Sequence, residues 1–236
     1  MITNSEGDIQ YFQAEAITDF VQRFVHKNHV RSILDIGAGS PNTACKISST
    51  VPRYQAIEGN VDRYFRLIDA GVNALYGTFP LKISGQFDLV LSSHSIPEEG
   101  MHLYPPFLKA AWANVSCGGT LQIITFKGCG GAVKSLRQTL TRRSTNESRE
   151  RDLIMEILGC LGSVSVESFD SHCYGSTVEG MASFLGPWIA VNRSAALEAN
   201  LMEEIKCRLE TGDGRYLIAT QHLVISCKKA GRMLAI

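Results

Sequence analysis

The sequence has no excess of charge of either sign, because 23 lysines and arginines are balanced by 23 aspartates and glutamates. Proteins that bind nucleic acid or an anionic membrane surface usually carry a basic face, which this balance does not favour. The chain also contains no apolar run near the roughly 20 residues that span a bilayer. Its first residues are polar and acidic, unlike a secretory signal peptide. We therefore expect neither a nucleic acid nor a membrane as a partner.

Three arrangements of reactive side chains are also missing. The seven cysteines are scattered, their number is odd and none forms a Cys-x-x-Cys pair. Such usage is typical of reduced thiols and predicts a cytoplasmic protein. No cluster of cysteine, histidine and acidic residues has the spacing of a metal site, so we expect no metal. A Gly-x-Ser-x-Gly motif for acyl transfer is absent as well.

The composition that remains is that of an ordinary globular protein. Hydrophobic residues make up 44% and charged residues 19% of the 236 positions, which suffices for a sizeable core. This length predicts a single domain of ordinary size, and two smaller domains are the alternative that length alone leaves open.

Short apolar segments alternate with amphipathic segments over most of the chain. The expected strands are residues 32–36, 53–57, 73–76, 87–91, 120–126, 164–168 and 215–228. The expected helices are residues 9–25, 41–49, 61–70, 105–115, 151–161 and 195–209. A glycine turn is expected at 117–119, and a looser segment around 180–187.

This alternation predicts an α/β fold. Continuous apolar strands suit a parallel sheet that is buried on both faces, and the closing pair of strands suits an antiparallel edge. We therefore expect a doubly wound, mostly parallel seven-stranded sheet with helices on both faces and an antiparallel edge strand.

The most informative segment joins the first expected strand to the next helix. Asp35 lies two residues before Gly37, and Gly39 follows after one more residue. Two glycines let the backbone turn sharply and let a ligand approach the main chain. Ser40 is a favourable N-cap, and Pro41 suits the first helical position. The segment therefore predicts the strand–turn–helix unit of a nucleotide-type binding site.

Three interpretations of this turn are open. A dinucleotide site requires a third glycine where this chain has Asn42, and the carboxylate of Asp35 disfavours a pyrophosphate. A ligand with a cationic or hydroxyl-bearing edge suits that carboxylate better. The third interpretation is a strand–turn–helix unit that binds no ligand.

A second acidic residue, Glu58, ends the second expected strand. Ligands of such folds bind outside the carboxyl ends of parallel strands, so Glu58 and the glycine turn should face the same crevice. A carboxylate in this position accepts hydrogen bonds from two ribose hydroxyls. The alternative is a surface glutamate that only ends a strand.

The Asp35-x-Gly37-x-Gly39 segment resembles the first motif of the class I (Rossmann-like) S-adenosylmethionine-dependent methyltransferases. The resemblance is strongest over residues 30–127, and it implies the Rossmann-like version of the fold described above. The implied cofactor is S-adenosylmethionine, with S-adenosylhomocysteine as the product and no metal.

The resemblance also implies how the chain is divided. Residues 1–236 would form a single methyltransferase domain, with an N-terminal helical cap at 1–30 and variable substrate-side elements at 128–215.

The residues of the turn would border the methionine part of the cofactor, and Glu58 would hold the ribose. After the third strand the family usually has an acidic or polar residue beside the adenine, where this chain has Thr78 and Phe79. Phe79 suits adenine stacking and core packing equally. The implied cofactor-binding residues are Asp35, Gly37, Ala38, Gly39, Glu58, Gly59, Thr78, Phe79, Ser92 and Ser93.

His94 is the candidate catalytic residue, because it follows the fourth expected strand and histidine accepts a proton near neutral pH. The alternative is a histidine hydrogen-bonded within a Ser-His-Ser turn, since alignment alone supplies much of the rate in such reactions. The substrate-side candidates are Tyr11, His94, Tyr104 and His172.

The leading hypothesis is methyl transfer from S-adenosylmethionine to a nitrogen or oxygen of a small molecule. A small-molecule acceptor is expected from the neutral charge and from the lack of an added recognition domain. The two alternatives are an NAD(P)-dependent oxidoreductase and a non-catalytic, methyltransferase-like scaffold subunit.

Overall fold

The computed structural model describes residues 9–97, 100–126, 136, 147–189 and 195–231. The chain forms two compact units. The first unit comprises Met1–Ala16, Phe126–Glu147 and Phe169–His222, and the second comprises Ile17–Thr125, Ser148–Ser168 and Leu223–Ile236. Within the described ranges, no helix is both long and apolar enough to cross a membrane.

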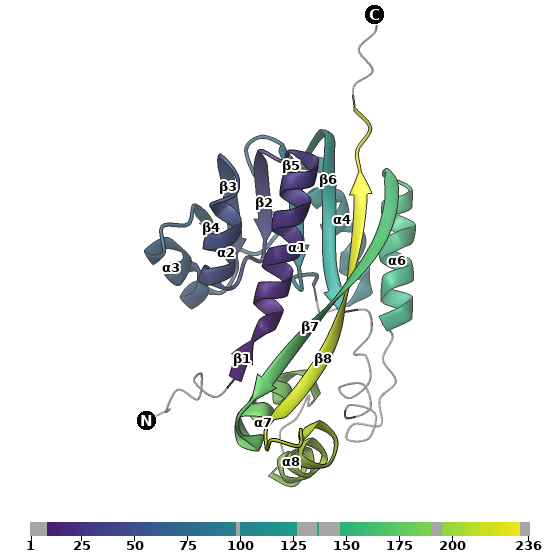
Figure 1. Cartoon of the computed structure of the whole chain (residues 1–236). Helices are drawn as coiled ribbons and strands as arrows, with labels where there is room; N and C mark the ends of the chain where they lie inside the picture. Colours follow the sequence, from purple (N-terminus) through teal and green to yellow (C-terminus); the bar gives the residue numbers. More distant parts are fainter. Residues whose placement is uncertain (1–8, 98–99, 127–135, 137–146, 190–194, 232–236) are drawn as a thin grey trace, which may run out of the picture. The chain divides into compact units, whose positions relative to one another are not determined.

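The second unit is built on a parallel sheet (Figure 1). Its parallel strands are β2 (Ser32–Ile36), β3 (Arg53–Glu58), β4 (Ala74–Tyr76), β5 (Phe87–Ser93) and β6 (Val115–Phe126). β2 lies between β3 and β5, β4 pairs with β3, and β6 pairs with β5. All five strands therefore have their carboxyl ends at one edge of the sheet.

Two long strands complete this sheet in the order β7-β8-β6. They are β7 (Ser163–Gly175) and β8 (Tyr216–Lys228), and both continue into the first unit. The side chain of Gln122 in β6 donates a hydrogen bond to the Ser226 hydroxyl in β8, and Lys229 N–H donates to the Gly119 carbonyl. These pairs show that β8 runs antiparallel to β6. The expected mostly parallel sheet with an antiparallel edge is confirmed, and the short strand β1 (Ile9–Tyr11) beside β7 adds one strand to the expected seven.

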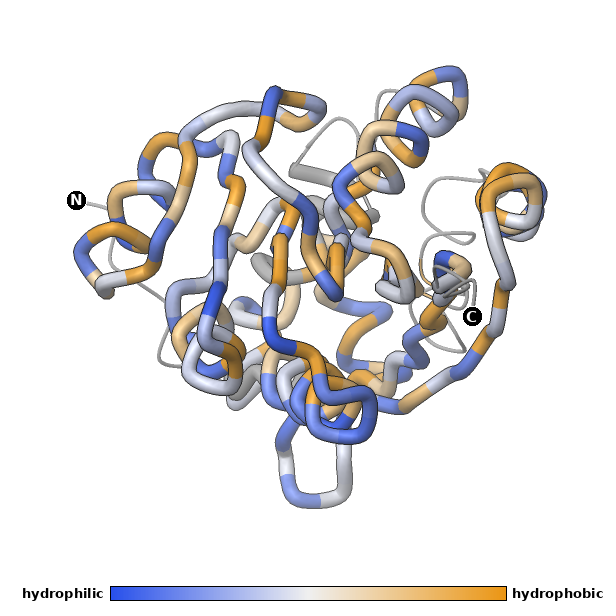
Figure 2. Tube along the Cα trace, turned by 90° about the horizontal axis from the view of Figure 1, so that it is seen from above, coloured by the Kyte–Doolittle hydropathy of each residue, from blue (hydrophilic) through white to orange (hydrophobic). Residues whose placement is uncertain are grey.

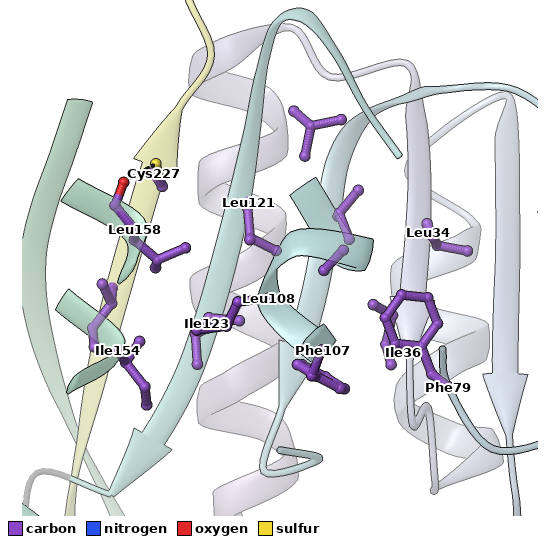
Figure 3. Close-up of a cluster of buried hydrophobic side chains, with 14 of the residues drawn as sticks. Leu34, Ile36, Phe79, Phe107, Leu108, Leu121, Ile123, Ile154, Leu158 and Cys227 are labelled. Carbon is purple, nitrogen blue, oxygen red and sulfur yellow. Dashed lines mark hydrogen bonds between the residues drawn. The ribbon is translucent and has the colours of Figure 1, made fainter. Parts of the chain in front are cut away.

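Helices cover both faces of the sheet of the second unit. They are α1 (Phe12–Asn28), α2 (Pro41–Ser48), α3 (Val61–Asp69), the short η2 (Met101–Leu103), α4 (Tyr104–Ala113) and α6 (Glu147–Gly159). Helices α4 and α6 pack on one face and α1 lies on the other (Figure 3). Hydrophobic and hydrophilic residues alternate along the helices, as expected for helices that bury one side (Figure 2).

The ends of α2 and α3 follow from local sequence. The side chain of Asn60 accepts a hydrogen bond from Arg63 N–H at 3.0 Å and so caps α3. Gly71 follows α3 with a φ of +77°, which glycine adopts without strain. Ser40 has the extended backbone of an N-cap, but its side chain makes no capping hydrogen bond, and Pro41 begins α2.

One apolar cluster holds the sheet of the second unit to α4 and α6 (Figure 3). Leu34 and Ile36 of β2 face this cluster, which places Asp35 on the opposite face. The ring of Phe79 meets the ring of Phe107 edge-on, with centroids 5.3 Å apart at 82°. The strand that carries Asp35 is therefore backed by a rigid core.

The first unit has a separate apolar core. It contains α7 (Val178–Ile189), α8 (Ala195–Leu209) and the distal parts of β7 and β8. Met181 and Leu185 of α7 pack there with Ile205 of α8 and Ile218 of β8. A short strand, β1 (Ile9–Tyr11), pairs antiparallel with β7 in the same unit.

Several local expectations were wrong. Residues 9–11 form strand β1 rather than the first turn of a helix, because β7 supplies them with backbone partners. The expected exit turn at 117–119 is an irregularity inside β6, where pairing with β5 shifts from Val115 to Thr120.

The expected loose segment around 180–187 is helix α7, despite its glycines and proline. Burial of Met181, Ala182 and Leu185 in the first unit's core outweighs the low helix propensity of the glycines and the proline in this segment. β7 also extends far beyond the expected 164–168, because its distal half pairs with β1.

We expect Phe107→Ala to lower the free energy of unfolding by about 3–5 kcal/mol, because it leaves a cavity beneath Phe79. Urea denaturation measures this loss. Phe65→Ala, at a side chain that is 57% exposed on α3, is the matched control and should change stability by roughly 0.5 kcal/mol or less. Equal losses in the two variants would contradict this assignment of the core.

Candidate functional site

The turn after β2 has the conformation that only glycine tolerates easily. Gly37 and Gly39 have φ values of +73° and +61°. The N–H groups of Gly37 and Ala38 both donate to the Ile57 carbonyl, at 2.8 and 3.2 Å, which fixes the turn against β3. A Cβ on Gly37 would lie 2.4 Å from the Cβ of Ser95, so no larger residue fits there.

Ser95, which follows β5, also holds this turn in place. Its hydroxyl donates to the Ile36 carbonyl at 2.5 Å and shares a hydrogen bond with the Ser92 hydroxyl at 2.8 Å. By contrast, a Cβ on Gly39 would meet nothing nearer than the Gly37 carbonyl oxygen at 3.8 Å. The main chain at Gly39 is therefore open to the close approach of a ligand.

Glu58, at the end of β3, links the turn to the start of α3. One carboxylate oxygen accepts a hydrogen bond from Gly39 N–H at 2.9 Å, and the other accepts one from Asn60 N–H at 2.8 Å. The side chain is only 6% exposed. Each oxygen of a carboxylate has capacity for a second hydrogen bond, so Glu58 can also accept from a ligand hydroxyl.

Asp35 lies on the same face of the sheet and is 4% exposed. Its Oδ2 accepts a hydrogen bond from the Tyr54 hydroxyl at 2.6 Å. Burial raises the pKa of Asp35 to about 6; the Tyr54 hydrogen bond lowers it, and the Glu58 carboxylate raises it. The edge of the sheet thus presents two buried carboxyl groups beside an open glycine turn, which suits a ligand with cationic and hydroxyl groups.

The remaining expected cofactor residues follow β3 and β4 or lie at the end of β5. A Cβ on Gly59 would lie 3.1 Å from the Thr78 hydroxyl oxygen, so these two residues are neighbours, and Thr78 is exposed. Phe79 is 6% exposed and belongs to the core with Phe107. Ser92 is fully buried and bonds Ser95.

The substrate-side candidates fall into both units. His94 is half-buried directly after β5, beside the expected cofactor residue Ser93, which is also half-buried. His94 has a φ of +51°, and its N–H donates to the Ile124 carbonyl. Histidine adopts this left-handed conformation more readily than most residues. Tyr104 begins α4 and is 6% exposed.

Tyr11 and His172 belong to the first unit. Tyr11 pairs with Cys173 in the β1–β7 ladder, which places its backbone beside His172, an exposed residue. The side chain of Tyr11 lies outside what the structure describes. The structure thus gathers the expected cofactor residues in the second unit, and the roles of Tyr11 and His172 stay predictions.

Sequence reasoning missed Tyr54 and Ser95. Tyr54 and Glu58 share a face of β3, because side chains alternate along a strand, and this periodicity was the available signal. Ser95 gave no such signal, since its role depends on the fold that brings it to Gly37. Where the structure describes the chain, no group of histidine, cysteine and acidic residues could hold a metal ion.

We expect Gly37→Ala to destabilise the protein more than Gly71→Ala. Both glycines have a positive φ, whose replacement by alanine costs about 1–2 kcal/mol. Only the Cβ at position 37 also overlaps Ser95, which adds about 1–3 kcal/mol. Urea denaturation measures both losses, and in a Ser95→Gly background Gly37→Ala should lose only the part due to its positive φ. Equal stability of the two single variants would contradict the contact.

We expect the stability of the protein to fall, relative to Asp35→Asn, as the pH rises from about 4 to about 6. Folded Asp35 keeps its proton up to a pKa of about 6, above the ordinary value of 3.8 for an aspartate, so ionisation opposes folding in this range. The difference in unfolding free energy should change by up to about 3 kcal/mol. Thermal or urea unfolding of both proteins across this range measures it. A difference independent of pH would show that Asp35 ionises normally.

Comparison with known proteins gives matches in structure and none in sequence. No protein-family model matches the chain, and neither does any curated protein. The YcgJ protein from Bacillus subtilis matches over 90% of this chain and 98% of its own, with a TM-score of 0.57 and 13% identity.

Two similar structures carry enzyme names. The N-methyltransferase NodS from Bradyrhizobium japonicum matches over 93% of this chain and 97% of its own, with a TM-score of 0.54 and 11% identity. The O-methyltransferase TomG from Streptomyces achromogenes, in complex with S-adenosylmethionine (SAM), matches over 91% of this chain and 80% of its own, with a TM-score of 0.51 and 13% identity. At such identities the likeness is one of fold, and this chain has the Rossmann-like fold of the class I SAM-dependent methyltransferases.

Proposed function

We propose that the protein is a SAM-dependent methyltransferase that acts on a nitrogen or oxygen atom of a small molecule. The observation that carries this proposal is the position of Glu58, a buried carboxylate that bonds both Gly39 N–H of the turn and Asn60 N–H of α3. A carboxylate there meets the ribose of a nucleoside ligand at the carboxyl ends of parallel strands.

The chemistry of the site favours SAM over a dinucleotide. A pyrophosphate is held by backbone N–H groups at a helix N-terminus, and a nearby negative charge opposes it. Here the N–H of Gly39 is already bonded to Glu58, and Asp35 is a second acidic group on the same face. SAM carries an ammonium, a sulfonium and a ribose but no phosphate, so both carboxyl groups would favour it.

The proposed contacts follow from the positions of the residues. Asp35 and the turn from Gly37 to Gly39 would hold the methionine part, and Glu58 would accept hydrogen bonds from the ribose. Gly59 and Thr78 would border the adenine, while the burial of Phe79 and Ser92 gives these two a supporting place beneath the site. When bound, SAM supplies a methyl group that its sulfonium activates for transfer.

On the acceptor side we propose His94, because it is half-buried directly after β5 and its backbone is fixed by the bond to Ile124. An imidazole there would take a proton from an acceptor hydroxyl or ammonium before the oxygen or nitrogen attacks the methyl group, and S-adenosylhomocysteine would then leave. Similar folds include an N-methyltransferase and an O-methyltransferase, which is consistent with either acceptor atom.

We expect isothermal titration to detect binding of SAM with a micromolar dissociation constant and to show tighter binding of SAM than of NAD(P)H. Glu58→Ala should weaken SAM binding roughly 10- to 100-fold, as expected for the loss of hydrogen bonds to a charged group. Glu203→Ala, at an exposed glutamate of α8, is the matched control and should bind like the unaltered protein.

Three results would contradict the proposal in different ways. Preferred binding of NAD(P)H would support an oxidoreductase, and binding of neither ligand would support a scaffold subunit. Unchanged affinity in Glu58→Ala would remove Glu58 from the site.

A further inference from the structure

The buried hydroxyl of Tyr54 donates a hydrogen bond to an acidic residue of the glycine-turn motif. The side chain is 7% exposed, and its hydroxyl donates to Asp35 Oδ2 at 2.6 Å. Tyr54 pairs with Ile33 in the parallel ladder, and Asp35 pairs with Ala56, so both side chains stand on adjacent rigid strands. This bond therefore sets the orientation of the Asp35 carboxyl group.

The bond also acts on the charge of Asp35. Burial opposes ionisation of this group, whereas a donated hydrogen bond stabilises the ionised form. The ionisable groups around the pair are Glu58 on β3, which also opposes ionisation of Asp35, and Cys45 on α2, which is close to Tyr54. Burial and Asp35 raise the pKa of Tyr54, so its hydroxyl keeps its proton and remains the donor.

We propose that Tyr54 is a positioning residue of the SAM site, whose hydroxyl orients the Asp35 carboxylate toward the ammonium of the ligand and holds it ionised at neutral pH. This inference rests on the proposed function and adds to it a residue that makes no ligand contact itself. The Tyr54 hydroxyl bonds Oδ2 of Asp35, and Oδ1 of Asp35 would then accept from the ammonium of the ligand. A protonated Asp35 would offer the ammonium no charge.

A pH dependence of ligand affinity follows from this arrangement. With a pKa of about 6, Asp35 is protonated in acid and ionised above neutrality, so affinity should rise with pH through this range. Removal of the Tyr54 hydroxyl removes the group that favours ionisation. The rise in affinity should then occur at higher pH, and affinity near neutrality should fall.

The test is isothermal titration of S-adenosylhomocysteine, which retains the ammonium, into the full-length protein between about pH 5 and about pH 8. If loss of the Tyr54 hydroxyl raises the pKa of Asp35 by about one unit, Tyr54→Phe should bind roughly twofold more weakly near pH 7 and roughly tenfold more weakly near pH 5. Its affinity should rise at higher pH than that of the unaltered protein. Asp35→Asn should lose most of the pH dependence, and Tyr54→Phe should weaken binding no further in the Asp35→Asn background.

Tyr216→Phe is the matched control, because Tyr216 is a buried tyrosine of the first unit, and it should bind like the unaltered protein. Thermal unfolding of each variant reports whether it is folded, and the double variant separates an effect through Asp35 from a general loss of packing. Identical affinity and pH profile in Tyr54→Phe and the unaltered protein would overturn this inference alone. So would an equal loss in the Asp35→Asn background. Absence of binding by the unaltered protein at every pH would instead overturn the proposed function on which it rests.

Discussion

The site depends on the carboxylate of Glu58, which accepts hydrogen bonds from Gly39 N–H and Asn60 N–H. Through it the turn after β2 and the start of α3 are held at one edge of the sheet. The core beneath β2 makes that edge rigid, and the contact between Gly37 and Ser95 fixes the turn from the neighbouring strand end. A ligand would therefore meet a preformed surface, which limits the ordering that binding requires.

Two buried carboxyl groups on one face are costly to fold around unless each has partners. Glu58 has backbone N–H groups, and Asp35 has the hydroxyl of Tyr54. The hydrogen-bond donors to the two carboxyl groups are therefore of different types. The backbone donors at Glu58 are lost by substitution only with proline, whereas the donor to Asp35 is the side chain of Tyr54. The electrostatics of the site are thus most open to change at Tyr54.

Sequence patterns predicted the elements whose causes are local, and they missed those whose causes are distant. The helix expected at 61–70 forms as α3, because its cap, Asn60, and its own residues suffice to set its start. Strand β1 at residues 9–11 and helix α7 at 178–189 depend on partners far along the chain. The carboxylates and glycines of the site were identified from spacing. Tyr54 and Ser95 were not, because the contacts that give them a role exist only in the folded sheet.

A crystal structure of the protein with S-adenosylhomocysteine tests the central claim most directly, since it locates the ligand relative to Glu58. The account predicts both ribose hydroxyls within hydrogen-bond distance of the Glu58 carboxylate and the ligand lying along the Gly37–Gly39 turn. It also predicts that the bonds from Glu58 to Gly39 and Asn60 are retained in the complex. A ligand bound elsewhere, or a ribose that does not contact Glu58, would contradict the account.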